Sequence, residues 1–306
     1  MNRPPKVHER NRAENLPGDL FLSIGGITLR ITASEPDLKL CAEGTKEKFL
    51  VHDVEPHATL AVTRRHLGHE STGEKIFDSG SIWQLYRKDN LHLFRFTSPA
   101  YGPTPYKMAS FDEGFKAGNI YLHRPFFPAA QPIDPISYPL DELIFVNLLA
   151  KGRGAEIHAC GIIDPGGKGH LFVGQSGAGK TTMARIWQDE AGVKILSDDR
   201  IILRKNQNKI WIYGTPWHGE AGFALPTGAP LEAIYFLQKG PKNELVPLGR
   251  TESAARLLAC SFTPLYFRDA VDFTLAFFEQ VVQAVAACEL RFLPDTRVPE
   301  LIASNW

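Results

Sequence analysis

Short runs of alternating apolar and polar residues, separated by turn residues, dominate the first part of the chain. Two of these runs flank Gly25-Gly26, and two others flank Lys88-Asp89-Asn90. Alternation predicts β-strands with two distinct faces, and turn residues between two such runs predict a hairpin. We therefore expect a β-rich N-terminal domain over residues 19–137, after a polar segment, 1–18, that predicts a flexible arm. The predicted strands are residues 20–24, 27–31, 82–86, 91–96 and 120–123.

Helical and strand patterns alternate in the second part of the chain. A segment dense in proline, 125–139, opposes both helix and central strand and predicts a linker or crossover. Apolar residues then recur at helical spacing over 140–149, with Asp141 and Glu142 in the first turn, where the helix dipole favours negative charge. The alternation predicts an α/β domain over residues 138–306. Its further predicted helices are 181–189, 254–258 and 273–287, and its predicted strands are 157–163, 170–173, 195–196, 201–203, 209–213 and 290–293.

Composition and charge narrow the class of protein. Lys and Arg together number 34, as do Asp and Glu, and this balance argues against nucleic acid or a charged membrane surface as a partner. No apolar run approaches the roughly 18 residues that span a bilayer. The start of the chain lacks an apolar signal-peptide region, and its four cysteines form no CxxC pair. We therefore expect a cytoplasmic protein with reduced thiols, not a zinc ribbon or a disulfide scaffold.

The strongest chemical signal is the segment GQSGAGKT, residues 174–181, which matches the phosphate-binding pattern G-x-x-x-x-G-K-[ST] at every required position. A predicted strand precedes it and a predicted helix follows it, as this pattern requires. Its glycines let backbone N–H groups turn toward phosphate oxygens, Lys180 adds positive charge, and the Thr181 hydroxyl can coordinate Mg²⁺. The sequence therefore predicts binding of ATP with Mg²⁺, with GTP or pyrophosphate as alternatives. The predicted nucleotide-binding residues are Gly174, Gln175, Ser176, Gly177, Ala178, Gly179, Lys180, Thr181 and Thr182.

An acidic pair, Asp198-Asp199, follows this loop by about one helix and stands at the end of a short β run. Two adjacent carboxylates can divide two tasks, holding Mg²⁺ and accepting the proton of an attacking hydroxyl. We assign the metal to Asp198 together with Thr181, and the proton to Asp199, with the reverse assignment left open. The alternative is a solvated turn between two strands.

Two further ionisable residues are candidates for the same site. His158 lies on the predicted strand upstream of the loop and would approach the phosphates if that strand and the loop strand are neighbours. The alternative is a structural histidine. Glu220 ends the segment 214–220, which follows a predicted strand, and is a candidate metal carboxylate. The alternative for this segment is a rigid turn around a buried Trp217.

Taken together, residues 158–161, 174–181 and 196–200 resemble the catalytic domain of HPr kinase/phosphorylase, in the order histidine, phosphate loop, acidic pair. The resemblance covers about residues 138–302. It implies a phosphoenolpyruvate-carboxykinase-like P-loop fold of the α/β class, with a mixed sheet and flanking helices. It also implies a kinase that uses ATP and Mg²⁺ and phosphorylates a serine of a protein or peptide. In this resemblance one aspartate of the pair is the catalytic base, and His158 and Lys180 lie near the reacting phosphate.

The sequence leaves the acceptor open. The family's second signature, an Arg-Asn-rich segment followed by a glutamate, has no evident counterpart here, which leaves phosphorylase activity open too. A kinase for a small metabolite such as free serine is the alternative enzyme, and a nucleotide-binding regulatory module is the non-catalytic alternative. The apolar stripe of the helix over 273–287 is expected to face the core, and it leaves a homo-oligomer open.

Overall fold

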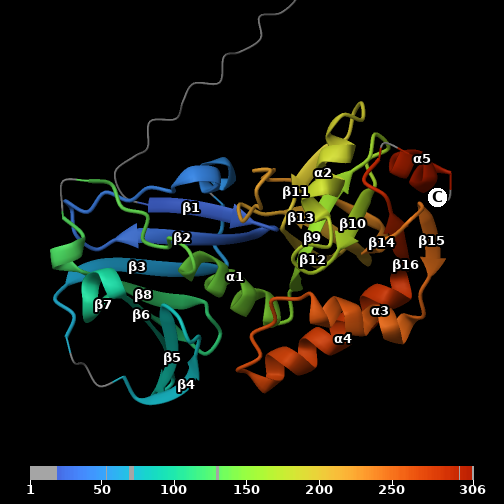
Figure 1. Cartoon of the computed structure of the whole chain (residues 1–306). Coiled ribbons are helices and arrows are strands. Elements are labelled where there is room, and N and C mark those ends of the chain that lie inside the picture. Colours follow the sequence, from blue (N-terminus) through green and yellow to red (C-terminus); the bar gives the residue numbers. More distant parts are fainter. Residues whose placement is uncertain (1–18, 53, 69–71, 129–130, 296, 305–306) are drawn as a thin grey trace, which may run out of the picture.

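The computed structural model describes residues 19–304 apart from 53, 69–71, 129–130 and 296, so the arm predicted over 1–18 lies outside the described residues. The chain is of the mixed α/β class, with two large β-sheets and few helices. Figure 1 shows the two sheets side by side, with α1 (Leu140–Ala150) between them. No helix in the described part of the chain is long and apolar enough to cross a membrane.

The first sheet contains all strands up to residue 123. Its order is β1-β2-β3-β8-β7-β6-β5-β4, with β3 parallel to both of its neighbours and the other pairs antiparallel. Ile24 faces Ile27 across the Gly25-Gly26 turn, which confirms the predicted hairpin. The bounds are β1 (Asp19–Ile24), β2 (Ile27–Ala33), β3 (Ala58–Arg65), β4 (Glu74–Asp78), β5 (Trp83–Lys88), β6 (Leu91–Ser98), β7 (Gly102–Asp112) and β8 (Ala117–His123).

The second sheet has the order β10-β9-β12-β13-β14-β16-β15, and β11 pairs with β9 beside β12. Because β10 also pairs with β14, the strands β10, β9, β12, β13 and β14 close into a ring. The bounds are β9 (Ala155–Ile163), β10 (Gly169–Val173), β11 (Lys194–Ser197), β12 (Arg200–Asn206), β13 (Lys209–Gly214), β14 (Gly228–Lys239), β15 (Glu244–Pro247) and β16 (Ala286–Phe292).

Helices cover both faces of the second sheet (Figure 1). On one face α2 (Lys180–Gln188) and α5 (Arg297–Ala303) pack on a core that includes Phe172 and Tyr235. On the other face α3 (Arg250–Ala259) and α4 (Arg268–Ala284) pack on a core that includes Ile157 and Ile234. Apolar side chains on both faces explain why the strands of this sheet read as continuous apolar runs.

The predicted helix over 273–287 is too long. The helix α4 ends at Ala284, and Ala286 and Ala287 already belong to β16. Ala286 pairs with Ala233 of β14, and the parallel ladder continues to Phe292. The helical spacing of apolar residues continues past Ala284 in the sequence. The chain nevertheless forms a strand there, because β14 and β15 on either side of β16 satisfy its backbone N–H and C=O groups. The sequence also did not indicate β3, β4, β7, β14, β15 or α5.

The proline-dense segment is a crossover held by two buried lysines, Lys107 on β7 of the first sheet and Lys46 in the 3-10 helix Gly44–Phe49 between β2 and β3. The Lys107 ammonium on β7 donates to the carbonyl oxygens of Pro135 and Ser137, at 3.3 and 3.1 Å. The Lys46 ammonium lies 2.5 Å from the Asp134 carboxylate and 3.3 Å from that of Asp141. Because α1 follows directly after it in the chain, the crossover fixes the position of α1 between the sheets.

Candidate active site

The phosphate loop has the strand and the helix that its pattern requires, because β10 ends at Val173 and α2 begins at Lys180. Gly177 and Gly179 have φ values of 80° and 109°, a region that favours glycine. A Cβ on Gly174 would lie 2.6 Å from the Cβ of Ala178, so this position also needs glycine. The three glycines therefore set the shape of the loop.

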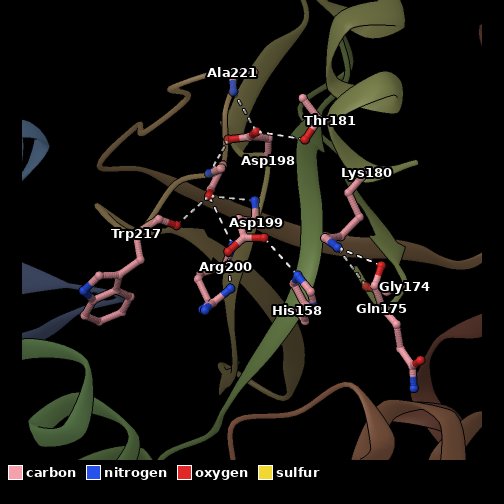
Figure 2. Close-up of polar contacts among 12 residues, drawn as sticks. His158, Gly174, Gln175, Lys180, Thr181, Asp198, Asp199, Arg200, Trp217 and Ala221 are labelled. Atoms are coloured by element: carbon pink, nitrogen blue, oxygen red, sulfur yellow. Dashed lines mark hydrogen bonds and ion pairs between the residues drawn. The ribbon is translucent and has the colours of Figure 1, made fainter. Parts of the chain in front are cut away.

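Lys180 lies folded over this loop. Its ammonium donates to the carbonyl oxygens of Gly174 and Gln175, at 3.0 and 3.1 Å (Figure 2). The side chain is buried, and burial lowers the pKa of the ammonium. The negative charge of Asp199 acts in the other direction but does not outweigh burial. A positive charge with little surrounding water is well placed to attract a phosphate.

Asp198 links the phosphate loop to a second loop, residues 215–227, which connects β13 to β14. The side chain is fully buried and follows the end of β11. The Thr181 hydroxyl donates to its carboxylate at 3.3 Å, and the backbone N–H groups of Gly219 and Ala221 donate at 3.0 and 3.2 Å (Figure 2). A carboxylate beside a hydroxyl offers the oxygen ligands that Mg²⁺ prefers. The structure thus brings together the two residues that the sequence assigned to the metal.

Asp199 points to different partners. Its carboxylate lies 2.9 Å from Nε2 of His158 and forms an ion pair with Arg200 (Figure 2). The contact arises because β12 pairs with β9, in a register that sets Arg200 opposite His158. Burial alone would raise the pKa of Asp199, but the hydrogen bond from His158 and the nearby positive charges outweigh it and hold that pKa below its usual value.

Glu220 stands apart from this cluster. It is exposed on the second loop, between the two residues whose N–H groups reach Asp198. In the ranges that the structure describes, no three His, Cys, Asp or Glu side chains gather into a metal-binding group. Mg²⁺ commonly binds through one or two protein ligands together with substrate phosphates and water. Thr181 and Asp198 are such a pair without Glu220.

The other predicted nucleotide-binding residues lie along the phosphate loop and at the start of α2. Gln175, Ser176 and Gly177 are exposed, and Ala178 and Thr182 are half-buried. In the second loop the Trp217 ring packs against Phe145, and its carbonyl oxygen accepts a hydrogen bond from Ser197. That arrangement agrees with the alternative of a rigid turn around Trp217. The same turn also presents the two N–H groups to Asp198.

A cavity of about 470 Å³ adjoins the phosphate loop. Its walls come from the first half of the loop, from the end of β14 and from α3. Cys260, at the α3 side, accepts a hydrogen bond through its carbonyl oxygen from the backbone N–H of His158, at 2.7 Å. The cavity therefore lies beside the loop, and one of its lining residues is hydrogen-bonded to the histidine that contacts Asp199.

Three residues of the site were missed from the sequence. Arg200 directly follows the acidic pair, and its position was the available signal. Gly219 lies in the second loop, where a Cβ would stand 2.7 Å from an oxygen of Asp198. Glu142 was explained by the helix dipole, yet its carboxylate lies 2.7 Å from Arg200.

Comparisons with known proteins place few constraints on this site. No protein-family model matches the chain, and no curated protein matches it in sequence. Among solved structures, the chain is similar to the Hpr(Ser) kinase/phosphatase from Coxiella burnetii. The identity is 13% and the TM-score 0.26, over 49% of this chain and 86% of that chain. The similarity is weak and carries no information on the chemistry of the site.

Proposed function

We propose that this protein is a kinase that uses ATP and Mg²⁺ to phosphorylate a serine hydroxyl of a protein or peptide. One observation carries the proposal: the Thr181 hydroxyl, at the start of the helix after the phosphate loop, donates to Asp198, while the adjacent Asp199 contacts His158. A metal pair and a separate carboxylate within reach of one phosphate loop are what phosphoryl transfer requires.

The nucleotide is held by the chain's backbone and by Lys180. The N–H groups of the loop, the start of α2 and the Lys180 ammonium together supply positive potential for the β- and γ-phosphates. Thr181 and Asp198 fit Mg²⁺, because a hydroxyl and a carboxylate in contact with each other offer the ion two oxygen ligands. The bound metal ion would neutralise charge that develops on the transferring phosphoryl group.

Asp199 is the proposed base. A depressed pKa keeps its carboxylate ionised at neutral pH, ready to accept a hydrogen bond and then the proton from the serine hydroxyl. His158 fixes the orientation of this carboxylate from the neighbouring strand. Orientation matters most here, since phosphoryl transfer depends mainly on positioning and electrostatic stabilisation.

A kinase for a small metabolite such as free serine is the second candidate function. The cavity beside the loop and Cys260, at about 470 Å³, lies in the size range of small-molecule pockets. A protein or peptide acceptor and free serine are therefore compared in the same assay.

The test is transfer of labelled γ-phosphate from MgATP to a cell lysate, to serine peptides and to free serine. We expect Asp199→Asn to reduce transfer at least about a hundredfold, the range for loss of a general base, while MgATP affinity changes little. Asp189→Asn makes the same chemical change at an exposed position at the end of α2 and should leave transfer unchanged. MgATP binding without transfer to any acceptor would indicate a regulatory module, and absence of binding would refute the proposal.

A further inference from the structure

Arg200, which has no role in the proposed reaction, lies at the centre of a group of charged side chains that includes the proposed base. Its guanidinium forms an ion pair with Asp199 through Nη1, and its Nε lies 2.7 Å from the Glu142 carboxylate. The carboxyl group of Glu156 lies 3.5 Å from the same Nε. The guanidinium also stacks on the ring of Phe262, with 4.0 Å between its carbon and the ring centroid. The carboxylates contact the edge of the guanidinium and the aromatic ring contacts its face, and together they restrict it to one orientation.

Glu156 is a buried acidic side chain beside Arg200. The side chain is buried on β9, and neither of its carboxyl oxygens has a hydrogen-bond partner in the part of the chain that the structure describes. Burial raises the pKa of Glu156 well above its usual value, and the neighbouring Glu142 raises it further. Arg200 therefore contacts the carboxylates of Glu142 and Asp199 directly, and Glu156 lies beside them as a buried neighbour.

The helix α1 carries one end of this network. Asp141 and Glu142 are consecutive in its first turn, and both are buried. Asp141 lies 3.3 Å from the ammonium of Lys46, in the connection between β2 and β3, whereas Glu142 reaches Arg200 on β12. The two carboxylates of one helical turn therefore link this connection to the residue that pairs with Asp199.

We propose that Arg200 is a positioning residue for Asp199, and that Glu142, together with the ring of Phe262, holds its guanidinium in the required orientation. The inference rests on the proposed function, because it concerns the base of that reaction. Arg200 limits the directions in which the Asp199 carboxylate can point, because it binds the carboxylate oxygen that His158 does not contact.

The test compares Glu142→Gln and Arg200→Lys with the wild-type protein. Glutamine keeps the size of the Glu142 side chain and removes its charge, and lysine keeps the charge of Arg200 without its planar fork. We expect kcat to fall about tenfold in each, as for loss of one charge-assisted hydrogen bond, with the KM for MgATP within twofold. The control Glu232→Gln removes the partner of Lys168 in an exposed ion pair away from the site and should change neither value.

A second readout does not depend on turnover. The ring nitrogen resonances of His158, assigned by comparison with His158→Gln, report its contact with Asp199. We expect them to shift in Glu142→Gln and Arg200→Lys and to stay constant in Glu232→Gln. Unchanged kcat and unchanged His158 resonances in both variants would overturn the inference, as would equal changes in kcat and KM that follow loss of thermal stability.

The two proposals can fail separately. A wild-type protein that transfers phosphate to no acceptor refutes the proposed function. The His158 resonances alone then decide whether Arg200 positions Asp199: a shift in the two variants supports this, and constancy excludes it.

Discussion

Thr181 and Asp198 are 17 positions apart in the chain, yet they form one unit at the scale of single residues. Each contributes an oxygen to the proposed metal position, and the hydroxyl donates to the carboxylate. Side chains in direct contact commonly show coupled effects on substitution. Their coupling is therefore the most direct test of whether the pair holds Mg²⁺.

We expect Thr181→Ala and Asp198→Asn each to weaken MgATP binding by about tenfold, the magnitude of one charge-assisted hydrogen bond. The double variant should lose less than the sum of the two free-energy changes, because each substitution already disrupts the shared site. Calorimetric titration with MgATP measures all four proteins. Thr251→Ala is the control, since Thr251 is the second residue of α3, as Thr181 is of α2, and is exposed. Full additivity would argue against a shared metal position.

At the scale of elements, the second loop acts on the site through its backbone. Gly219 and Ala221 present their N–H groups to Asp198, on a loop that follows β13. A side chain at Gly219 would meet the carboxylate that its own N–H binds. The conformation of the loop and the position of Asp198 are therefore linked.

We predict that Gly219→Ala displaces this loop and lowers the free energy of unfolding by about 1–3 kcal/mol, the usual cost of overpacking. Transfer activity should fall more than stability alone explains, because Asp198 loses N–H donors. Urea unfolding and the Mg²⁺ dependence of transfer measure the two effects. Gly249→Ala is the control, since a Cβ at Gly249 has no atom within 4 Å and its φ is −66°. Equal behaviour of the two variants would contradict this account.

Local patterns at the element scale identified hairpins, the phosphate loop and its helix. The Gly25-Gly26 hairpin and the loop at 174–179 were predicted because turn residues and glycine spacing dictate the backbone within a few positions. The strand β14 was not predicted, although it is central to the second sheet, and the end of α4 was misplaced. Both errors concern apolar segments whose conformation depends on which strand lies beside them.

At the scale of the whole molecule, two buried lysines hold the crossover, one on the first sheet and one in the connection between β2 and β3. Burial lowers the pKa of Lys107 to about 8 in the folded protein, compared with 10.5 for an ordinary lysine. Lys46, paired with Asp134 and Asp141, has a raised pKa instead. The two lysines should therefore affect the free energy of unfolding differently as pH rises.

Between about pH 8 and 10.5 the unfolded chain keeps the Lys107 proton and the folded protein has released it. The unfolded state then binds more protons, so the free energy of unfolding rises with pH. Between pH 8 and 9.5 the free energy of unfolding of the wild-type protein should therefore rise by about 2 kcal/mol relative to that of Lys107→Met. Lys46 itself should add no such slope, because its raised pKa keeps it protonated in both the folded and the unfolded state over this range. Urea unfolding at several pH values provides the comparison, and parallel curves for Lys107→Met would exclude the effect.

The sequence alone identified the parts of this site that depend on neighbouring residues: the phosphate loop, its lysine and threonine, and the acidic pair. Only the tertiary structure decided how they meet. Asp199 contacts His158 across 41 positions, and Arg200 contacts Glu142 across 58. The first contact exists because β12 pairs with β9. The second exists because α1 lies between the two sheets (Figure 1), where Glu142 reaches Arg200. Strand pairing and helix packing are long-range properties that no local spacing specifies, which is why the roles of Arg200 and Glu142 emerged only from the fold.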